Sequence, residues 1–227
     1  MKKIIIAIDG ESSSGKTSLA KKLANKIGYK HINTGSMYRA VTFAALKNDL
    51  IFDSCREFDT KSIIRLVNRL TFNFKLVNNV SNILLNGVNV EENIRSTIVS
   101  DFVSQISAIP EVRKKIVSIQ RNLGIHKGVV MEGRDIGSVV FPKAELKFFI
   151  TANLETRVYR RFKELVEKGI NIEKSLVYAN LKKRDFLDKN REVSPLLQCK
   201  DAIRIDNTNL TINDQILIIE DHIQKIT

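Results

Sequence analysis

Residues 10–17 read Gly10-Glu11-Ser12-Ser13-Ser14-Gly15-Lys16-Thr17 and follow directly on the apolar run Ile4-Ile5-Ile6-Ala7-Ile8. This is a complete G-x-x-x-x-G-K-[S/T] phosphate-binding loop in its required setting, between a buried strand and a helix. Gly10 and Gly15 permit backbone angles that turn consecutive N–H groups toward phosphate oxygens. Lys16 brings positive charge to the β- and γ-phosphates, and the Thr17 hydroxyl can join the ligands of a bound Mg²⁺. The stretch predicts a nucleotide-binding enzyme or switch, with a helix over residues 19–27 whose positive end faces the anion.

The composition is that of an ordinary globular chain. It has 227 residues, 43% of them hydrophobic and 27% charged, which predicts a single domain with or without inserts. No apolar run approaches the roughly 18–20 residues that would span a bilayer, and the N-terminus lacks the pattern of a signal peptide. Cys55 and Cys199 are the only cysteines. We therefore expect a cytoplasmic protein with reduced thiols and no membrane partner.

The chain is strongly basic, with a net charge of +12 and a pI near 9.7. Such a charge can indicate nucleic-acid binding, or a site that must hold several phosphate groups. The Lys and Arg residues are spread along the sequence, without a basic tail or a patch interleaved with aromatic residues. We therefore expect no nucleic-acid partner.

The apolar pattern predicts an α/β fold with a five-stranded, mostly parallel sheet flanked by helices. Helical patterns separate the candidate strands, and two further helices are expected at Pro110–Gly124 and Leu210–Ile226. The candidate strands are Ile4–Ile8, a weaker one at His31-Ile32, Gly128–Met131, Leu146–Ile150 and Ala202–Ile205.

One stretch breaks the alternation of strands and helices. Residues 71–79 and 81–90 are rich in β-formers and are split by an Asn turn, so they predict a small antiparallel hairpin or three-stranded unit. We expect a β-containing substrate-binding insert at about 40–110, and a helical segment at about 153–191 that covers the loop as a lid. The core of the single domain would then comprise 1–39, 111–152 and 192–227.

Two arginines follow successive strand ends, where ligands collect in open α/β sheets. Arg39 lies in Thr34-Gly35-Ser36-Met37-Tyr38-Arg39, and Arg134 lies in Gly133-Arg134-Asp135-Ile136-Gly137. Both can grip a second anion in bidentate fashion, with Asp135 accepting hydrogen bonds beside it. The alternative is that each arginine is solvated or paired with a nearby acid.

The lid segment carries two charged rows at helical spacing. Arg157, Arg160 and Arg161 would share one helical face, and so would Arg184, Asp188 and Arg191. Cations that close over a transferred phosphoryl group would stabilise its charge and exclude water. The alternative is a solvated face, in which Arg184 and Asp188 form an ordinary helix pair worth about 0.5 kcal/mol or less.

Together these motifs resemble the bacterial cytidylate kinase family. The loop, T-G-S-M-Y-R, S-Q-I-S-A-I-P-E-V-R, G-R-D-I-G-S-V-V-F-P and R-D-F-L-D-K-N-R occur in the order and at the separations of that family, from about Ile4 to Asn207. The resemblance implies a P-loop nucleoside monophosphate kinase fold. It also implies direct in-line transfer of the ATP γ-phosphoryl to CMP or dCMP, giving ADP and CDP or dCDP, with Mg²⁺ as cofactor and Thr17 as its protein ligand.

The resemblance also implies residue roles. Thr34, Arg39 and Arg134 would hold the CMP phosphate; Ser104, Arg113 and Asp135 would read cytosine; Arg184 and Asp188 would contact the ribose; Arg191 would lie near the transferred group. The implied ATP site is Gly10, Glu11, Ser12, Ser13, Ser14, Gly15, Lys16, Thr17 and Ser18, and the implied catalytic cations are Lys16, Arg134, Arg157, Arg161 and Arg191, with Arg160 as a further lid cation. A carboxylate matches the cytosine N4 amine, and an arginine matches N3 and O2.

The loop departs from the family's usual G-P-[S/A]-[S/G]-[S/A]-G-K-[S/G] form at two positions. Glu11 replaces the usual Pro, and Ser13 stands where glycine is frequent. A carboxylate beside a polyanion is costly unless its side chain points to solvent, so Glu11 is expected to weaken ATP affinity somewhat without removing activity. Thr34 replaces a frequent Ser and keeps the hydroxyl group.

Three alternatives remain at this point. A P-loop kinase of another nucleoside monophosphate, such as UMP or AMP, or of a small metabolite such as shikimate, would share the loop. The basic charge leaves a nucleic-acid-binding NTPase open. A switch GTPase would need a guanine-reading N-K-x-D segment, and none stands in a suitable place. We expect a monomer, because nothing in the sequence indicates an obligate interface.

Overall fold

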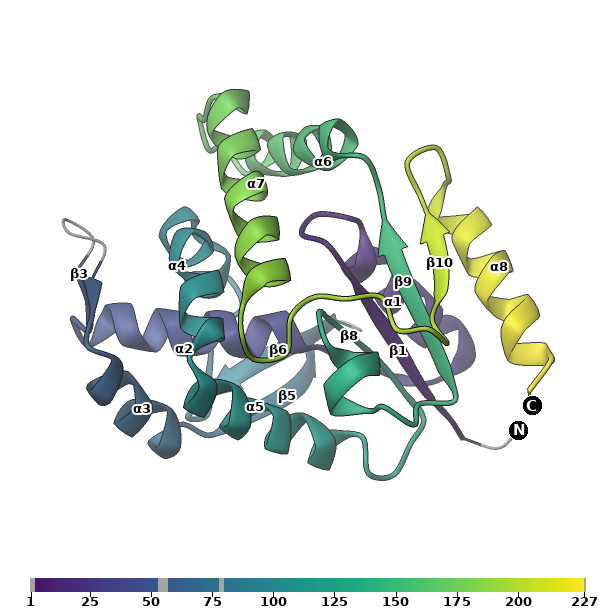
Figure 1. Cartoon of the computed structure of the whole chain (residues 1–227), viewed down its shortest axis with the longest axis horizontal. Helices are drawn as coiled ribbons and strands as arrows, with labels where there is room; N and C mark the ends of the chain where they lie inside the picture. Colours follow the sequence, from purple (N-terminus) through teal and green to yellow (C-terminus); the bar gives the residue numbers. More distant parts are fainter. Residues whose placement is uncertain (1–2, 53–56, 78–79, 227) are drawn as a thin grey trace. The chain divides into compact units, whose positions relative to one another are not determined.

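The chain divides into two units, and a five-stranded sheet organises the first (Figure 1). The computed structural model describes residues 3–52, 57–77 and 80–226. The first unit comprises Met1–His31 and Gly124–Thr227, and the second comprises Ile32–Leu123. Cys55 and the predicted turn at Asn78-Asn79 lie outside the described residues.

The sheet has the order β10-β9-β1-β8-β2. Strand β1 pairs in parallel with β8 and with β9, and β9 pairs in parallel with β10. Every residue of β1 is buried, as expected of a strand covered on both faces. The five predicted strands and the fold class are confirmed. The strands are β1 (Ile5–Gly10), β2 (Lys30–Asn33), β8 (Val129–Gly133), β9 (Leu146–Thr151) and β10 (Ile203–Asp206).

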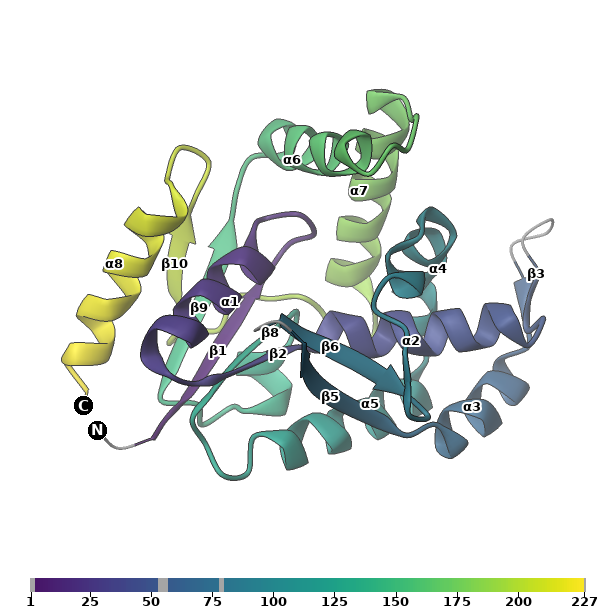
Figure 2. The same cartoon turned by 180° about the vertical axis from the view of Figure 1, so that it is seen from behind.

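Helices α1 (Lys16–Ile27) and α8 (Ile212–Gln224) belong to the core of this unit, and Figure 2 shows α1 in front of β1. Ile6 and Ile8 of β1 face this core, since alternate strand residues share a face. The odd-numbered Asp9 points to the opposite face, where its carboxylate meets the π-helical turn Ile136–Val140. Helix α1 begins at Lys16, three residues before the predicted start, so its first turn is the end of the phosphate loop.

The lid segment 153–191 folds as two helices, α6 (Leu154–Glu167) and α7 (Lys174–Asn190). They pack on each other through a small apolar cluster formed by Val158, Leu165, Val177 and Leu181. Within the described ranges, no helix is long and apolar enough to cross a membrane.

The second unit contains the predicted β-rich stretch as a three-stranded antiparallel sheet in the order β5-β6-β7. The unit extends on both sides of residues 40–110, because α2 begins before residue 40 and α5 continues beyond residue 110. Its elements are α2 (Thr34–Lys47), β3 (Ile51–Phe52), β4 (Glu57–Phe58), α3 (Thr60–Arg69), β5 (Phe72–Val77), β6 (Val80–Leu85), β7 (Val88–Asn89), a 3₁₀ turn (Asn93–Arg95), α4 (Thr97–Ala108) and α5 (Pro110–Leu123).

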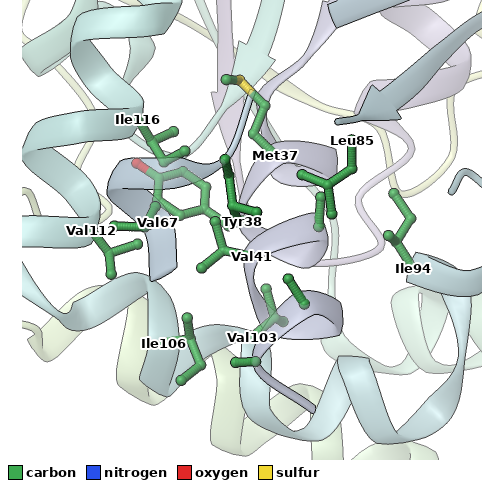
Figure 3. Packing of buried hydrophobic residues seen from close by; sticks show 14 of the residues in the cluster. Met37, Tyr38, Val41, Val67, Leu85, Ile94, Val103, Ile106, Val112 and Ile116 are labelled. Carbon is green, nitrogen blue, oxygen red and sulfur yellow. The ribbon is translucent and has the colours of Figure 1, made fainter. Parts of the chain in front are cut away.

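A separate apolar core holds this unit together (Figure 3). Met37 and Val41 of α2 contribute to it, together with Ile106 of α4 and Val112 and Ile116 of α5. Pro110 begins α5 where its missing N–H costs nothing, as the sequence predicts. The first unit and this one therefore each have a hydrophobic core of their own.

Candidate active site

The phosphate loop connects the end of β1 to the start of α1. Gly10 has φ 148° and Gly15 has φ 86°, angles that L-residues rarely adopt, so the predicted need for glycine is confirmed. A Cβ atom at Gly10 would lie 2.0 Å from the Ile150 carbonyl oxygen of β9. The first intrahelical bond of α1 runs from the Leu19 N–H to the Gly15 carbonyl, so the amides of residues 16–18 lie at the positive end of the helix.

Lys16 lies over its own loop. Its Nζ donates to the Glu11 carbonyl oxygen and to Ser14 Oγ, the latter at 3.1 Å, and the side chain is buried. Burial and the nearby positive charge of Arg134 lower the pKa of Lys16 from 10.5 to about 7, against the opposing effects of Glu132, Asp9 and Asp185. The negative charge around Lys16 is therefore too small to offset the effects of burial and of Arg134 on its pKa.

Thr17 and His31 both contact the carboxylate of Glu132, a residue that the sequence did not predict as part of the site. Thr17 Oγ1 donates to Glu132 Oε2 at 2.9 Å, and His31 Nε2 lies 2.9 Å from Glu132 Oε1. Glu132 is buried near the end of β8, the strand beside β1. The signal was an acid directly before the G-R-D motif, at the carboxyl end of a strand. A hydroxyl and a carboxylate together are the oxygen donors that suit Mg²⁺.

Arg134 and Asp188 form an ion pair beside the loop. Arg134 Nε donates to Asp188 Oδ2 at 2.9 Å, and Arg134 Nη2 donates to Ser12 Oγ at 2.8 Å. Burial opposes ionisation of Asp188, but the charges of Arg134, Arg191 and Arg184 outweigh it and lower the pKa of the carboxyl. The sequence predicted both residues, and the structure brings them together.

Arg191 and Arg184 flank this pair. Arg191 Nη1 lies 3.6 Å from Asp188, and its Nε donates to the Ser194 carbonyl oxygen. Burial and the charge of Arg134 lower the pKa of Arg184 to about 10. Asp188 is buried and forms ion pairs with Arg134 and Arg191, so the alternative of a solvated charged face is wrong for Asp188. Arg134 reaches Asp188 from 54 residues away in the sequence, whereas Arg191 follows it by three residues.

The three arginines of α6 have different partners. Arg157 is buried and donates to the Ser12 carbonyl oxygen at 3.2 Å and to Asp185. Arg160 donates to the side chain and backbone of Asn207, both at 2.9 Å, and Arg161 pairs with Glu164 on its own helix.

Asn207 is a second residue that the sequence reasoning missed. It is buried just after β10, and its Nδ2 donates to the Ser14 carbonyl oxygen at 2.7 Å. The Oδ1 atom of the same side-chain amide accepts from Arg160. Asn207 thus connects the phosphate loop to the lid segment, and its position after the last strand end was the available signal.

The Glu11 side chain does not point to solvent. The residue is only 8% exposed. Its carboxylate accepts from Thr151 Oγ1 and from Lys189 Nζ, both at 2.8 Å, and lies 3.9 Å from Arg157. Burial raises the pKa of Glu11, but the hydrogen bonds from Lys189 and Thr151 and the charge of Arg157 outweigh it, so the pKa is lowered. The surrounding cations make burial of this carboxylate favourable.

Asp9 fixes the turn that follows Arg134 and Asp135. Its carboxylate accepts from the backbone N–H of Ile136 at 2.8 Å and of Gly137 at 2.7 Å. Burial raises the pKa of Asp9 to about 6, although these two hydrogen bonds oppose the shift. Asp135 is itself buried at the start of this turn, and its carbonyl oxygen accepts from two backbone amides of the turn.

Four further predicted residues belong to the second unit. Arg39 Nη1 donates to the Ile94 carbonyl oxygen and to Ser100 Oγ, both at 3.0 Å. The predicted convergence of Arg39 and Arg134 would join the two units, and it stays a prediction. The remaining three are Thr34 at the start of α2, Ser104 on α4 and Arg113 on α5.

Ser104 and Arg113 are connected through Ser107. Arg113 Nη1 donates to the Ser107 carbonyl oxygen at 2.9 Å, and Ser107 Oγ donates to the Ser104 carbonyl oxygen at 3.0 Å. The guanidinium of Arg113 also lies 5.0 Å from the centre of the Tyr38 ring, within cation–π distance. The structure therefore brings the two predicted base-reading residues of this unit into one neighbourhood.

Comparison with solved structures defines the class of fold. A phosphate loop between the first strand and helix of a parallel sheet, with arginines on a helical lid segment, is the arrangement of a P-loop kinase. A shikimate kinase from Bacteroides thetaiotaomicron aligns with a TM-score of 0.50 over 98% of this chain and 99% of its own, at 8% identity. An uncharacterised protein from Eubacterium ventriosum aligns with a TM-score of 0.54 over 99% of both chains, at 14% identity. These similarities concern the fold alone.

Sequence comparison identifies the family. The cytidylate kinase family profile matches residues 6–227. The cytidylate kinase of Flavobacterium psychrophilum is 46% identical over 228 residues, covering the whole of both chains, and that of Clostridium botulinum strain Langeland is 48% identical over 214 residues, 94% of each. The chain belongs to the cytidylate kinase family, and it is therefore an enzyme of the phosphotransferase class.

Proposed function

We propose that this enzyme transfers the γ-phosphoryl group of ATP to CMP or dCMP. The observation that carries the proposal is the group of buried cations around the phosphate loop, in a chain of this family. Lys16 and Arg184 both have lowered pKa values because burial and a neighbouring arginine act on each. Negative phosphate oxygens would restore both pKa values, so the site suits a polyanion.

The donor nucleotide is ATP, held by the loop. The amides at the start of α1 and the Lys16 ammonium face the phosphates. The oxygens of Thr17 and Glu132 suit Mg²⁺, which when bound would neutralise charge on the β- and γ-phosphates. Among the residues that the structure describes, no group of three His, Cys, Asp or Glu side chains could hold a metal ion by itself.

The acceptor is a cytidine monophosphate. Arg134 binds its phosphate, and Asp188, which already accepts from Arg134, contacts the sugar together with Arg184. Asp135 accepts from the N4 amine of cytosine, while Arg113 donates to N3 and O2. Thr34, Arg39, Ser104 and Arg191 complete the acceptor site.

The chemistry needs positioning and charge stabilisation more than proton transfer. The transferred phosphoryl group spreads negative charge over its oxygens, and cations held in place before the reaction stabilise that charge without reorganising. Lys16, Arg134, Arg157, Arg161 and Arg191 supply these cations. No general base is required, because the phosphate oxygen of the acceptor is already a nucleophile.

A panel of acceptors tests the proposal. With ATP as donor, CMP and dCMP should be phosphorylated far faster than UMP, AMP or shikimate in a coupled assay. Lys16→Ala should lower kcat by roughly 10²-fold or more while the circular dichroism spectrum is unchanged. Lys163→Ala is the matched control, since Lys163 is an exposed lysine of α6 that pairs with the exposed Glu167. A better turnover of AMP or shikimate, or a normal kcat for Lys16→Ala, would contradict the proposal.

We also propose that the enzyme acts in the cytoplasm as a monomer and uses no nucleic acid. The lid arginines support the last point, because Arg157 and Arg161 pair with carboxylates and Arg160 contacts Asn207. ATP hydrolysis that DNA or RNA stimulates, with a steep dependence on salt, would contradict it.

A further inference from the structure

Both backbone polar groups of Ser12 contact the lid segment. The Ser12 N–H donates to Asp185 Oδ1 at 3.4 Å, and the Ser12 carbonyl oxygen accepts from Arg157 Nη1 at 3.2 Å. The second oxygen of Asp185 accepts from the same Nη1. Ser12, Asp185 and Arg157 therefore form a closed ring of hydrogen bonds between the loop, α7 and α6.

A second carboxylate lies near Arg157. Glu11 Oε2 is 3.9 Å from Arg157 Nε, and the same Nε donates to the Ala152 carbonyl oxygen at 3.0 Å. Glu11 cannot swing away freely, because Thr151 and Lys189 hold its two oxygens. The guanidinium is thus held by a direct contact to Asp185 and by the charge of Glu11.

We propose that Asp185 and Glu11 are positioning residues that hold Arg157 against the phosphate loop, ready for the phosphates of the donor nucleotide. The proposal rests on the proposed function and adds to it two residues whose action passes through Arg157. A free arginine side chain has about 2 kcal/mol of rotamer entropy to lose when it becomes ordered. The two carboxylates and the Ser12 carbonyl oxygen impose that order before ATP arrives.

The contact distances rank the two residues. Asp185 accepts a charge-assisted hydrogen bond from Arg157, whereas Glu11 acts on it only through charge at 3.9 Å. Removing the negative charge of Asp185 should therefore cost more than removing that of Glu11. If a carboxylate served only to stabilise the fold, its removal would lower thermal stability, and the effect on kcat would not depend on Arg157.

A double-mutant cycle on the full chain separates these roles. Asp185→Asn should lower kcat roughly 10- to 100-fold with the KM for CMP within about twofold, and Glu11→Gln should lower kcat less than about fivefold. In an Arg157→Met background, either change should cost less than about twofold, because its target is gone. Glu167→Gln, on the exposed face of α6, is the matched control and should leave kcat unchanged.

A second measurement, binding of the fluorescent ATP analogue N-methylanthraniloyl-ATP, tests the proposal without any acceptor nucleotide. Asp185→Asn should weaken this binding in the wild-type background and leave it unchanged in the Arg157→Met background. Additive effects in both assays, or normal kcat and normal analogue binding in Asp185→Asn, would overturn the proposal. If Asp185→Asn does not fold, the Glu11→Gln cycle decides by the same criterion. A wild-type enzyme that turns over no cytidine monophosphate would contradict the proposed function, while the analogue-binding cycle would still decide the positioning role.

Discussion

Binding of ATP should draw a proton onto Lys16. In the free protein, burial and Arg134 lower the pKa of Lys16 to about 7, so at pH 8 about 0.9 of the side chains are neutral. Phosphate oxygens favour the charged form and should return the pKa toward 10.5. Binding of ATP should therefore be accompanied by proton uptake, about 0.9 proton per ATP at pH 8 and about 0.5 at pH 7. By the same linkage, the Kd for ATP should rise nearly tenfold between pH 8 and pH 9.

Isothermal titration calorimetry measures this uptake directly. The apparent binding enthalpy at pH 8 is recorded in several buffers that differ in ionisation enthalpy, and the slope gives the number of protons taken up. Lys16→Arg is the control, because a guanidinium remains charged at these pH values and should take up no proton. An equal uptake by Lys16→Arg would assign the proton to another group. No uptake by the wild type, with a Kd that does not change above pH 8, would refute the account of Lys16 given above.

Two substitutions test the loop and the acceptor site. Gly10→Ala places a Cβ atom 2.0 Å from the Ile150 carbonyl oxygen and should cost more than about 3 kcal/mol in urea unfolding. Gly28→Ala, also at positive φ but with no atom within 4 Å of the new Cβ, should cost only about 1 kcal/mol; equal costs would mean that backbone strain alone is responsible. Asp135→Ala should lower kcat/KM for CMP roughly 10²-fold or more, because the N4 amine of cytosine would lose its hydrogen-bond acceptor in a buried site. The Kd for ATP should change little. Equal losses for the two nucleotides would contradict its role in base recognition.

The architecture could be predicted because its signals are local. The buried strands β1, β8 and β9 are short apolar runs, and both the loop and the start of α5 carry residues with specific backbone preferences, Gly10, Gly15 and Pro110. The three-stranded sheet of the second unit was visible for the same reason, since its β-formers are consecutive. The start of α1 was placed three residues late because polar loop residues at 16–18 show no apolar period.

The contacts within the site could not be predicted from local sequence. Glu11 meets Thr151, which is 140 residues away, and Lys189, which is 178 residues away. Spacing along a helix suggested a pair between Arg184 and Asp188, but Arg134, 54 residues distant from Asp188, is its hydrogen-bond partner. The sequence shows which charged groups are present, but their pairing depends on the tertiary fold.

Ser12 explains why the two departures in the loop are compatible with its function. Its Oγ accepts from Arg134, its N–H donates to Asp185 and its carbonyl oxygen accepts from Arg157. All three polar groups of one residue are thus fixed by Arg134, which follows β8, and by two side chains of the lid segment, so the loop's shape does not depend on a proline at position 11. Ser13 can then adopt φ 58°, a conformation that costs a non-glycine residue about 1–2 kcal/mol, because contacts on both sides hold the backbone. Glu11, which the loop sequence alone indicates to be unfavourable, contributes to that support through Arg157 and Lys189.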